Sequence, residues 1–300
     1  DDHRGLLTLI FALLVGGLAV KAAMVPLHGW LPRAMVAPAP VSALLHAVAV
    51  VKAGAFGILR VIYDLYGIEL SVELGVTTVL AVAASITIIY GSLRAIAQEE
   101  LKPRLAFSTI SQVSYVVLGV SLFGPFGTIG ALAHLLHQGL MKVTLFFCAG
   151  NYAEELGIHR LDEMDGAGKR MPLTSLAFTV GALGMIGLPP TAGFITKWYL
   201  GMGAIEADMY WVVAVLVASS TLNAIYFLPI VHRLWFREGP AHGKGQWPKE
   251  QSLGRLETHG WLLWPAVLTA VISIGAGLLA GLPFSPLDWA TRVAVGEYLP

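Results

Sequence analysis

Four lysines stand inside stretches that otherwise carry almost no charge, and an amine in such a place can hold a proton and pass it on. They are Lys21, Lys52, Lys142 and Lys197. A lysine at the centre of a bilayer costs about 2.5 to 3.5 kcal/mol on insertion scales, so a chain that keeps four must use them, pair them or surround them with water. Their number and placement indicate charge movement through a membrane.

A polar stripe accompanies Lys142 on its predicted helix. His134, Gln138 and Lys142 are spaced by four residues, which places them on one helical face, and His137 borders that face. A single histidine on an apolar helix is more often a hydrogen-bonded core residue, but three polar residues in register favour a relay. Because burial disfavours the charged form of an amine, lysines bridged by histidine, glutamine and water can exchange protons. The stripe therefore predicts a proton relay.

For Lys52 and Lys197 the ordinary alternative is snorkelling, in which a long side chain lets the amine reach the membrane surface. Lys52 lies near the middle of its apolar run, six residues after His46, and this depth argues against snorkelling. Lys197 is expected in the first turn of a helix that resumes after an interruption. We predict that His46 and Lys52 belong to the relay, and that Lys197 joins it at the interruption.

The elements that must position these residues are membrane-spanning helices. Hydrophobic residues make up 56% of the chain and charged residues 13%, and the mean hydropathy is +0.71, which indicates an all-α polytopic membrane protein. Eight apolar runs are predicted to span, near residues 6–31, 41–63, 72–92, 105–123, 128–150, 173–200, 209–235 and 261–282. We predict a single membrane domain over residues 1–300 with about eight transmembrane helices.

Prolines interrupt two of the predicted helices beside a lysine. Pro26 follows Lys21 by five residues, and Pro189-Pro190 with Gly193 divides the sixth run. Proline removes a backbone donor and breaks or kinks a helix. Broken helices at membrane depth persist only where protein or a water-filled cavity satisfies the freed backbone groups, and transporters build ion sites at such breaks. The two breaks predict a hydrated interior.

Positive charges divide unequally between the two sides of the predicted bundle. Threading the eight runs places only Arg4, Arg60 and Arg292 on one side. The opposite side receives Arg33, Arg94, Lys102, Arg104, Arg160, Lys169, Arg170, Arg233, Arg237, Lys244, Lys249 and Arg255. By the positive-inside rule this second side is cytoplasmic, which makes residues 151–172 and 237–260 cytoplasmic loops and puts both termini outside a bacterial inner or plasma membrane.

Several classes of function are disfavoured by what the sequence lacks. The formal net charge is zero, so no basic surface for nucleic acid is expected. Cys148 is the one cysteine and lies in an apolar run, which excludes an intrachain disulfide or a cysteine-based metal site. We find no nucleophile beside a base, no phosphate-binding loop and no metal-ligand cluster, so we expect no catalysis and no cofactor of the chain's own.

Acidic residues are expected only in loops, at helix ends and at the termini. No carboxylate is therefore available deep in a span to balance Lys21 or to coordinate sodium, which prefers oxygen ligands. The chain also begins Asp1-Asp2-His3-Arg4, without a methionine or a secretory signal, and it reads as part of a longer polypeptide. We expect the missing counter-charge to come from elsewhere.

Several segments together resemble antiporter-like subunits shared by respiratory complex I and Mrp-type cation/proton antiporters. The matching segments are residues 21–46, residues 102–112 (KPRLAFSTISQ), residues 134–142 and residues 193–197 (GFITK), in the expected order. The resemblance implies a fourteen-helix subunit of two inverted five-helix repeats with a hydrated polar axis along the membrane plane. On that scheme, this chain corresponds to the last eight helices.

The resemblance also implies a role for individual residues. It implies that Lys21 pairs with a glutamate on an earlier helix and that His46 lines a gate. Lys52 is then the central relay lysine. His134 and Lys142 would form the relay of the second half, and Lys197 would be its terminal lysine. Gln138 stands where some relatives carry histidine. Lys102 matches a lysine near the axis but is equally a candidate cytoplasmic anchor, and His137 and His28 are further candidates.

Within this family we predict a proton-translocating subunit of a Mrp-type antiporter. The presence of a lysine at both position 52 and position 197 resembles the D-type subunit. The sequence of residues 219–230 resembles it as well. Alternatives are a pumping subunit of complex I or of a membrane-bound hydrogenase, and a purely structural membrane subunit. The expected partners are other membrane subunits and missing N-terminal helices that supply a buried glutamate, and the expected ions are protons and, as a second candidate, sodium.

Overall fold

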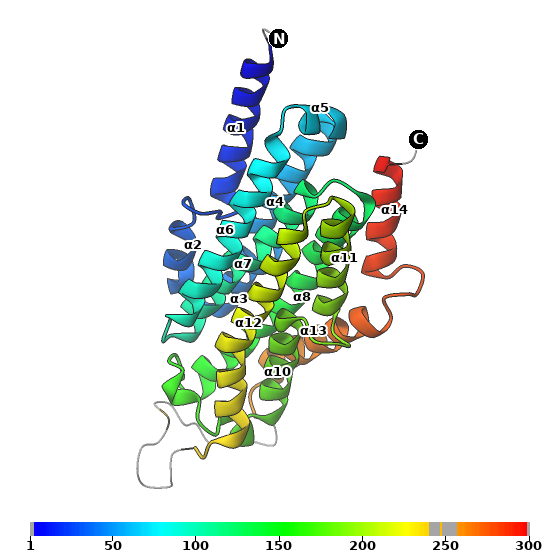
Figure 1. The fold of residues 1–300 in the computed structure, drawn as a ribbon. Helices are drawn as coiled ribbons and strands as arrows, with labels where there is room; N and C mark the ends of the chain where they lie inside the picture. Colours follow the sequence, from blue (N-terminus) through cyan, green and yellow to red (C-terminus); the bar gives the residue numbers. More distant parts are fainter. Residues whose placement is uncertain (1–2, 240–246, 248–256, 299–300) are drawn as a thin grey trace.

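All regular structure in the described part of the chain is helical, apart from one isolated β-bridge between Glu100 and Arg160. The structure is a computed structural model that describes residues 3–239, 247 and 257–298. Figure 1 shows an elongated bundle in which most helices run along one long axis and both chain ends lie at the same end. The predicted all-α polytopic membrane fold is confirmed.

Most of the predicted spans appear as long apolar helices. Within the described ranges, six helices have the length and hydropathy to cross a membrane: α1 (Arg4–Lys21), the composite span Ala39–Tyr66, α6 (Val76–Ile96), α8 (Pro125–Glu155), α12 (Tyr210–Phe236) and α13 (Gly260–Leu278). The composite span consists of α3 (Ala39–Ala43), η2 (Leu44–Val48), α4 (Val50–Arg60) and η3 (Val61–Tyr66), of which η2 and η3 are π-helical. The two remaining spans are the long helix α7 (Leu101–Ser121) and a broken pair, α10 (Pro172–Ile186) and α11 (Ala192–Glu206).

Both predicted breaks are present. Helix α1 ends at Lys21, and after a stretch of turns the chain resumes in the short elements α2 (Trp30–Arg33) and η1 (Ala34–Val36). Figure 1 shows α10 in the lower half of the bundle and α11 in the upper half, so the two together make one interrupted span. Lys197 lies in the second turn of α11 rather than in its first, because α11 already begins at Ala192.

A glycine from another helix packs directly against each break. A Cβ on Gly54 of α4 would come 2.7 Å from the carbonyl carbon of Lys21. A Cβ on Gly277 of α13 would come 2.7 Å from the backbone of Thr191 and of Ala192. Since no side chain fits in either place, neighbouring backbone braces both interruptions, as irregular segments at membrane depth require.

Helix α7 is buried on almost every side between α6 and α8, although it is rich in hydroxyl residues. Several of these hydroxyls donate to a carbonyl of the preceding turn: Thr109 Oγ1 to Leu105 O at 3.0 Å and Ser114 Oγ to Ile110 O at 3.0 Å. This satisfies the polar atoms inside an apolar bundle. The helix is therefore central to the bundle even though its composition is less apolar than that of its neighbours.

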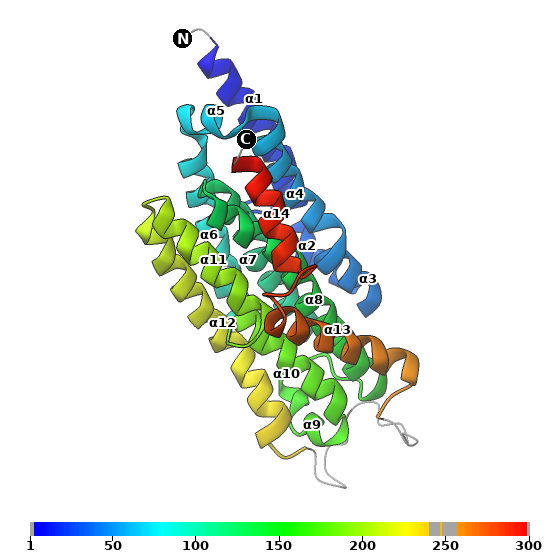
Figure 2. The same cartoon turned by 90° about the vertical axis from the view of Figure 1, so that its right-hand side faces the viewer.

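The boundaries of the last span and of the two loops differ from the sequence prediction. Helix α8 continues to Glu155, so the loop predicted at 151–172 is shorter, and the segment after α8 contains the short elements η4 (Asp162–Met164) and α9 (Ala167–Arg170). Most of the loop predicted at 237–260 lies outside the described residues. The last run, predicted at 261–282, ends at Leu278, and a further helix, α14 (Pro286–Tyr298), follows and rises toward the termini (Figure 2).

Candidate proton-relay site

Lys142 is enclosed by protein and is held by α7. Its amine donates to Leu105 O at 3.1 Å and to the hydroxyl oxygen of Ser108, and it lies 6.0 Å from the ring centroid of Phe227. All three partners are uncharged. Because a buried ammonium needs acceptors for its protons, the main chain and one hydroxyl here replace a carboxylate.

Lys197 reaches back across the break in its own span. Its amine donates to Met185 O at 3.1 Å, to Ile186 O at 2.7 Å and to Ser220 Oγ at 3.0 Å. The two carbonyls belong to the last turn of α10, where they lack helical partners and carry the negative end of the helix dipole. The amine is thus held at the C-terminus of α10. In this structure it does not extend toward the membrane surface, as a snorkelling lysine would.

Gly187 is the residue that makes this reach possible. It has φ +89°, a conformation that favours glycine, and a Cβ there would stand 2.7 Å from Cδ of Lys197. Asn223 completes the surroundings by donating from Nδ2 to Met185 O at 3.0 Å. The end of α10 is therefore built to receive a long basic side chain.

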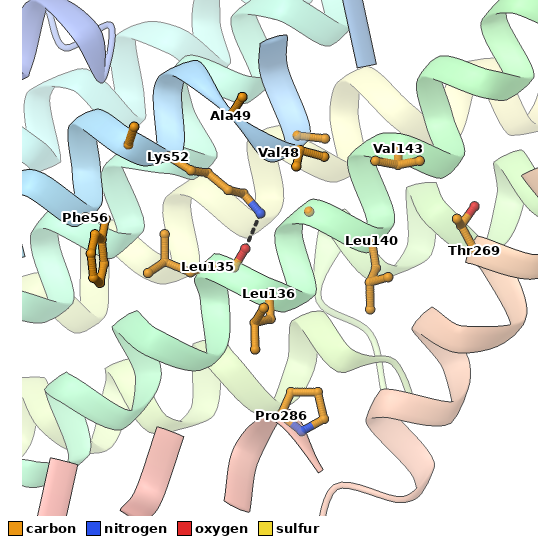
Figure 3. A pocket seen from close by; sticks show the side chains of 13 residues that line it. Val48, Ala49, Lys52, Phe56, Leu135, Leu136, Leu140, Val143, Thr269 and Pro286 are labelled. Carbon is orange, nitrogen blue, oxygen red and sulfur yellow. Dashed lines mark hydrogen bonds between the residues drawn. The ribbon is translucent and has the colours of Figure 1, made fainter. Parts of the chain in front are cut away.

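Lys52 lies near the middle of the 28-residue span Ala39–Tyr66. Its amine donates to Leu135 O of α8, as Figure 3 shows. The space for it comes from Gly139, since a Cβ on that glycine would overlap the Lys52 amine. Lys52 therefore points toward α8 at mid-span, and the prediction that it does not snorkel agrees with this geometry.

The predicted stripe on α8 faces the interior. His134, Gln138 and Lys142 are all at most 1% exposed, and His137 is also buried. His134 pairs through Nδ1 with Thr196 Oγ1 at 3.0 Å and lies 5.3 Å from the ring of Tyr115. The stripe thus connects α8 to α7 on one side and to α11 on the other.

Several buried polar atoms around this stripe make no hydrogen bond to the described residues. They are both ring nitrogens of His46 and of His137, Nε2 of His134, Nε2 of Gln138, both amide atoms of Gln112, the hydroxyl of Tyr115 and Oγ of Ser219. Buried polar groups nearly always have a partner, and ordered water supplies it where protein does not. The cluster is therefore suited to hold a chain of waters.

His46 lies apart from the stripe but within electrostatic range of Lys142. It is fully buried in the π-helical turn η2, with its ring centroid 5.0 Å from that of Phe146. A π-turn shifts the phase of a helix by adding a residue, so His46 and Lys52 can face different parts of α8. Their six-residue spacing also leaves them off a common helical face.

The other predicted residues lie at the edges of this arrangement. Lys21 is exposed at the end of α1 and makes no hydrogen bond or ion pair within residues 3–239, 247 and 257–298. His28 is half-buried between Tyr90 and Phe107, with ring centroids 5.0 and 6.3 Å away. Lys102 donates to Ala37 O at 2.8 Å and so ties α7 to the segment before α3, which leaves both of its proposed roles open.

Some contributing residues were not singled out by the sequence prediction. Ser108, Gln112 and Tyr115 follow one another by four and three residues on α7, a helical spacing that places them on one face beside the α8 stripe. This spacing could have identified the three residues from the sequence as neighbours of the relay. Thr196 and Ser220 carried no such signal, because their contacts depend on how α11 and α12 pack.

Two carboxylates are buried outside the relay, at the end of the bundle where α10 begins. Glu257 accepts hydrogen bonds from the backbone N–H of Leu173 at 3.1 Å and of Thr174 at 2.7 Å, and it thereby caps α10. Glu155 accepts from Thr258 Oγ1 at 2.6 Å. Burial raises the pKa of the Glu257 carboxyl, and the two N–H donors oppose that rise. Neither residue lies at the middle of a span.

No group of three histidine, cysteine, aspartate or glutamate side chains comes together among residues 3–239, 247 and 257–298. Cys148 is buried and donates from Sγ to Thr174 O at 3.3 Å, as expected for a packed side chain.

Comparisons with known proteins identify the family. The transmembrane family described as NADH:quinone oxidoreductase/Mrp antiporter matches residues 2–223. The chain is 40% identical over 283 residues to NADH-quinone oxidoreductase subunit N of Desulforudis audaxviator, covering 93% of this chain and 56% of that protein. It is 39% identical over 207 residues to hydrogenase-4 component B of Escherichia coli, covering 65% of this chain and 30% of that protein.

A solved structure of an Mrp complex supports the same family through its fold. A chain of the Mrp complex from Dietzia sp. superposes with a TM-score of 0.83 at 29% identity, covering 98% of this chain and 60% of that chain. The chain therefore spans 30% to 60% of the length of these three relatives.

Proposed function

Because this integral membrane chain belongs to the NADH:quinone oxidoreductase/Mrp antiporter transmembrane family, we propose that its buried lysines and histidines relay protons within the membrane. One observation carries the proposal. Lys52, Lys142 and Lys197 each donate to uncharged acceptors of neighbouring elements, and His134, His137 and Gln138 on the helix of Lys142 have buried polar atoms without a hydrogen-bond partner among the described residues. Intramembrane ionisable groups arranged in this way are typical of proton pathways.

We assign His134 as the connection between two of the lysines. It lies within electrostatic range of both Lys52 and Lys197, and its Nδ1 already bonds Thr196 beside Lys197. A neutral imidazole can accept a proton on one nitrogen and release one from the other, which suits it to bridge two amines. Lys142 and His46 form the second proposed connection, toward the π-helical turn of the central span.

For the assembly, we propose a proton-translocating subunit of a multi-subunit membrane complex. Lysines at positions 52 and 197 and the fold match to the Mrp complex support the Mrp-type antiporter. The 40% identity to a protein named as a NADH-quinone oxidoreductase subunit supports a pump of the complex I type as the second candidate. Mass spectrometry of the purified complex distinguishes them, because redox subunits would co-purify only with the second.

The relay is tested by replacing Lys52 with alanine in the assembled complex and measuring proton flux in sealed vesicles. We expect flux to be lost, because no other amine of the described residues contacts Leu135 O or occupies the space beside Gly139. Lys169→Ala is the matched control, since Lys169 is an exposed lysine on the short helix α9. A structural subunit without a relay predicts equal flux in both variants, and that result would refute the proposal.

The orientation in the membrane is part of the same proposal. We propose that the end of the bundle carrying Arg94 and Arg160 is cytoplasmic and that both termini are outside. Both termini lie at one end in Figure 1, as an even number of crossings requires. Labelling of single cysteines introduced at Arg160 and at Glu73 by a membrane-impermeant reagent tests it: we expect only the cysteine at position 73 to react from outside.

A further inference from the structure

Helix α12 carries two polar side chains, Asn223 and Tyr226, one turn apart, and neither has a role in the proposed relay. Both are fully buried within the bundle. The hydroxyl of Tyr226 donates to Asn223 Oδ1 at 2.5 Å, and Asn223 Nδ2 donates to Met185 O at 3.0 Å. Helix α12 runs alongside α10 and α11, the two halves of the broken span (Figure 1). The pair therefore meets the break at which Lys197 is held.

In the other direction the pair reaches the acceptor of Lys142. Tyr226 lies within hydrogen-bonding range of the Ser108 hydroxyl, and Ser108 accepts from the amine of Lys142. Arg104, one turn before Ser108 on α7, donates to the main-chain oxygen of Tyr226 at 3.0 Å and fixes α12 against α7 at this point. The contacts form one series between two lysines: Lys142, Ser108, Tyr226, Asn223, Met185 O and Lys197.

Met185 O is shared by two donors, the amide of Asn223 and, at 3.1 Å, the amine of Lys197. The amine also donates to Ile186 O and Ser220 Oγ, and neither of these receives another hydrogen bond from the described residues. Lys197 thus donates to three acceptors, which is the full number of N–H donors of an ammonium. Of the three acceptors, Met185 O is the one with a second donor.

Proton release from Lys197 changes this count. In the proposed relay the N–H bond on Lys197 breaks and a new N–H bond forms on the imidazole of His134, so two N–H donors remain for three acceptors. A buried acceptor left without a donor is costly. Met185 O can be given up at the least cost, because the Asn223 amide still donates to it.

We propose that Asn223 and Tyr226 are positioning residues of the relay, a role that rests on the proposed function. Asn223 keeps Met185 O partnered after Lys197 has released its proton. Tyr226 holds the Asn223 amide in the required orientation, because its hydroxyl donates to Oδ1 and a flipped amide would set Oδ1 against the carbonyl. Through Ser108 the same series reaches the acceptor of Lys142, so the hydrogen bonds of the two lysines are joined.

The titratable side chains that face Lys197 come from the helices packed around α11. His134 of α8 is within electrostatic range, and the ring centroid of Tyr115 of α7 lies 5.5 Å from the amine. His137 of α8 lies beside the main chain of Ala192, at the start of α11. Helices α10 and α13 carry no titratable side chain. Because none of these groups is a carboxylate, the neutral acceptors stabilise the charge on Lys197.

Asn223→Leu tests the role of the amide, since leucine has a similar volume and cannot form hydrogen bonds through its side chain. Proton flux is measured in sealed vesicles that contain the assembled complex, over a range of pH. In the variant, release from Lys197 leaves Met185 O without a donor. The rising limb of the flux profile should therefore move to higher pH by about one unit, and flux on that limb should fall about tenfold.

Asn151→Leu is the matched control. Asn151 is a buried asparagine of α8 that donates to a main-chain oxygen, Leu262 O, at 3.2 Å, but it has no contact with the relay lysines. Its flux profile should keep its position on the pH axis. The comparison separates loss of a buried amide in general from loss of the amide beside Lys197.

Tyr226→Phe removes a single oxygen and keeps the proposal testable if Asn223→Leu fails to assemble. It should move the profile in the same direction. Tyr152→Phe is its control, since the buried hydroxyl of Tyr152 bonds Ser175 Oγ at 2.8 Å, away from the lysines. In the double variant the shift should be no larger than in Asn223→Leu alone, because Tyr226 acts through Asn223.

A profile that does not move to higher pH in either variant would overturn the proposal, even if flux falls equally at every pH, because altered packing alone predicts no shift. Shifts that add in the double variant would overturn it as well. Failure of the relay itself gives a different result, namely flux that survives Lys52→Ala. Flux that is lost in Lys52→Ala but keeps its pH profile in the α12 variants refutes only the role of Asn223 and Tyr226.

Discussion

Replacing Gly139 by alanine tests the relay without removing any group that can carry a proton. The new methyl group would overlap the amine of Lys52 and stand 3.0 Å from Ala47 O and 3.5 Å from Lys52 Cε. The backbone carbonyl cannot move away easily, whereas the end of a lysine can. We therefore expect the amine to leave its position at Leu135 O while α8 and the central span keep their places.

The size of the effect follows from the bond that is lost. A hydrogen bond made by a charged group contributes about 1.5 to 3 kcal/mol, so the amine should occupy its original position about ten to 150 times less often. If proton transfer requires that position, flux falls by the same factor. The substitution itself should not weaken the helix, because alanine is favoured over glycine inside a helix by about 0.5 to 1 kcal/mol.

The assay is proton flux in vesicles that contain the assembled complex, measured for Gly139→Ala and for Gly16→Ala. Gly16 lies inside α1 with nothing within 4 Å of the position its Cβ would take, so it controls for the substitution type alone. We expect the control to transport normally. If a correctly assembled Gly139→Ala complex transports as fast as the control, the position of the Lys52 amine beside α8 has no part in proton transfer.

Three further predictions concern other contacts. Ser220→Ala removes one of the three acceptors of Lys197 and should slow flux by about tenfold with assembly unchanged, as a flux assay and native gels would show. Arg104 donates to Ile96 O, Gln98 O and Tyr226 O, and Arg104→Lys should lower the free energy of unfolding in detergent by about 2 to 4 kcal/mol. Burial raises the pKa of the Glu257 carboxyl, so the folded protein binds a proton at this carboxyl more tightly than the unfolded chain does. The free energy of unfolding should therefore fall as the pH rises from the usual glutamate range to the raised pKa. Glu257→Gln should abolish that fall in thermal unfolding measured across the same pH range.

The fold could largely be predicted from the sequence because lipid imposes simple rules. A span of apolar residues must be helical, and Pro26 and Pro189-Pro190 mark where helices cannot continue. Helix α14 was missed for a physical reason. It carries Asp288, Arg292 and Glu297 on an amphipathic helix, and a search for continuous apolar runs passes over it.

The candidate site was predictable in its residues but not in its contacts. The spacing of the α8 stripe fixed which side chains share a face. It could not show that Lys197 bonds the carbonyl end of α10, since that depends on how two half-helices meet and on the left-handed φ of Gly187. Arg104 was likewise placed among surface cations, whereas the packing of α6, α7 and α12 buries it against backbone carbonyls.

Lys52, Lys142 and Lys197 share a property that bears on how a relay of this kind would run. Lys52 bonds Leu135 O, Lys142 bonds Leu105 O and Lys197 bonds Met185 O and Ile186 O, so every one of them uses a carbonyl of the main chain. A proton that arrives on such an amine adds a full positive charge, because no carboxylate is present among the acceptors to cancel it. A positive charge on Lys52 or on Lys197 is felt at His134, which lies within electrostatic range of both amines. We infer that a proton on either amine would disfavour a second positive charge on the imidazole proposed to connect them, because no acid among the acceptors cancels the first charge.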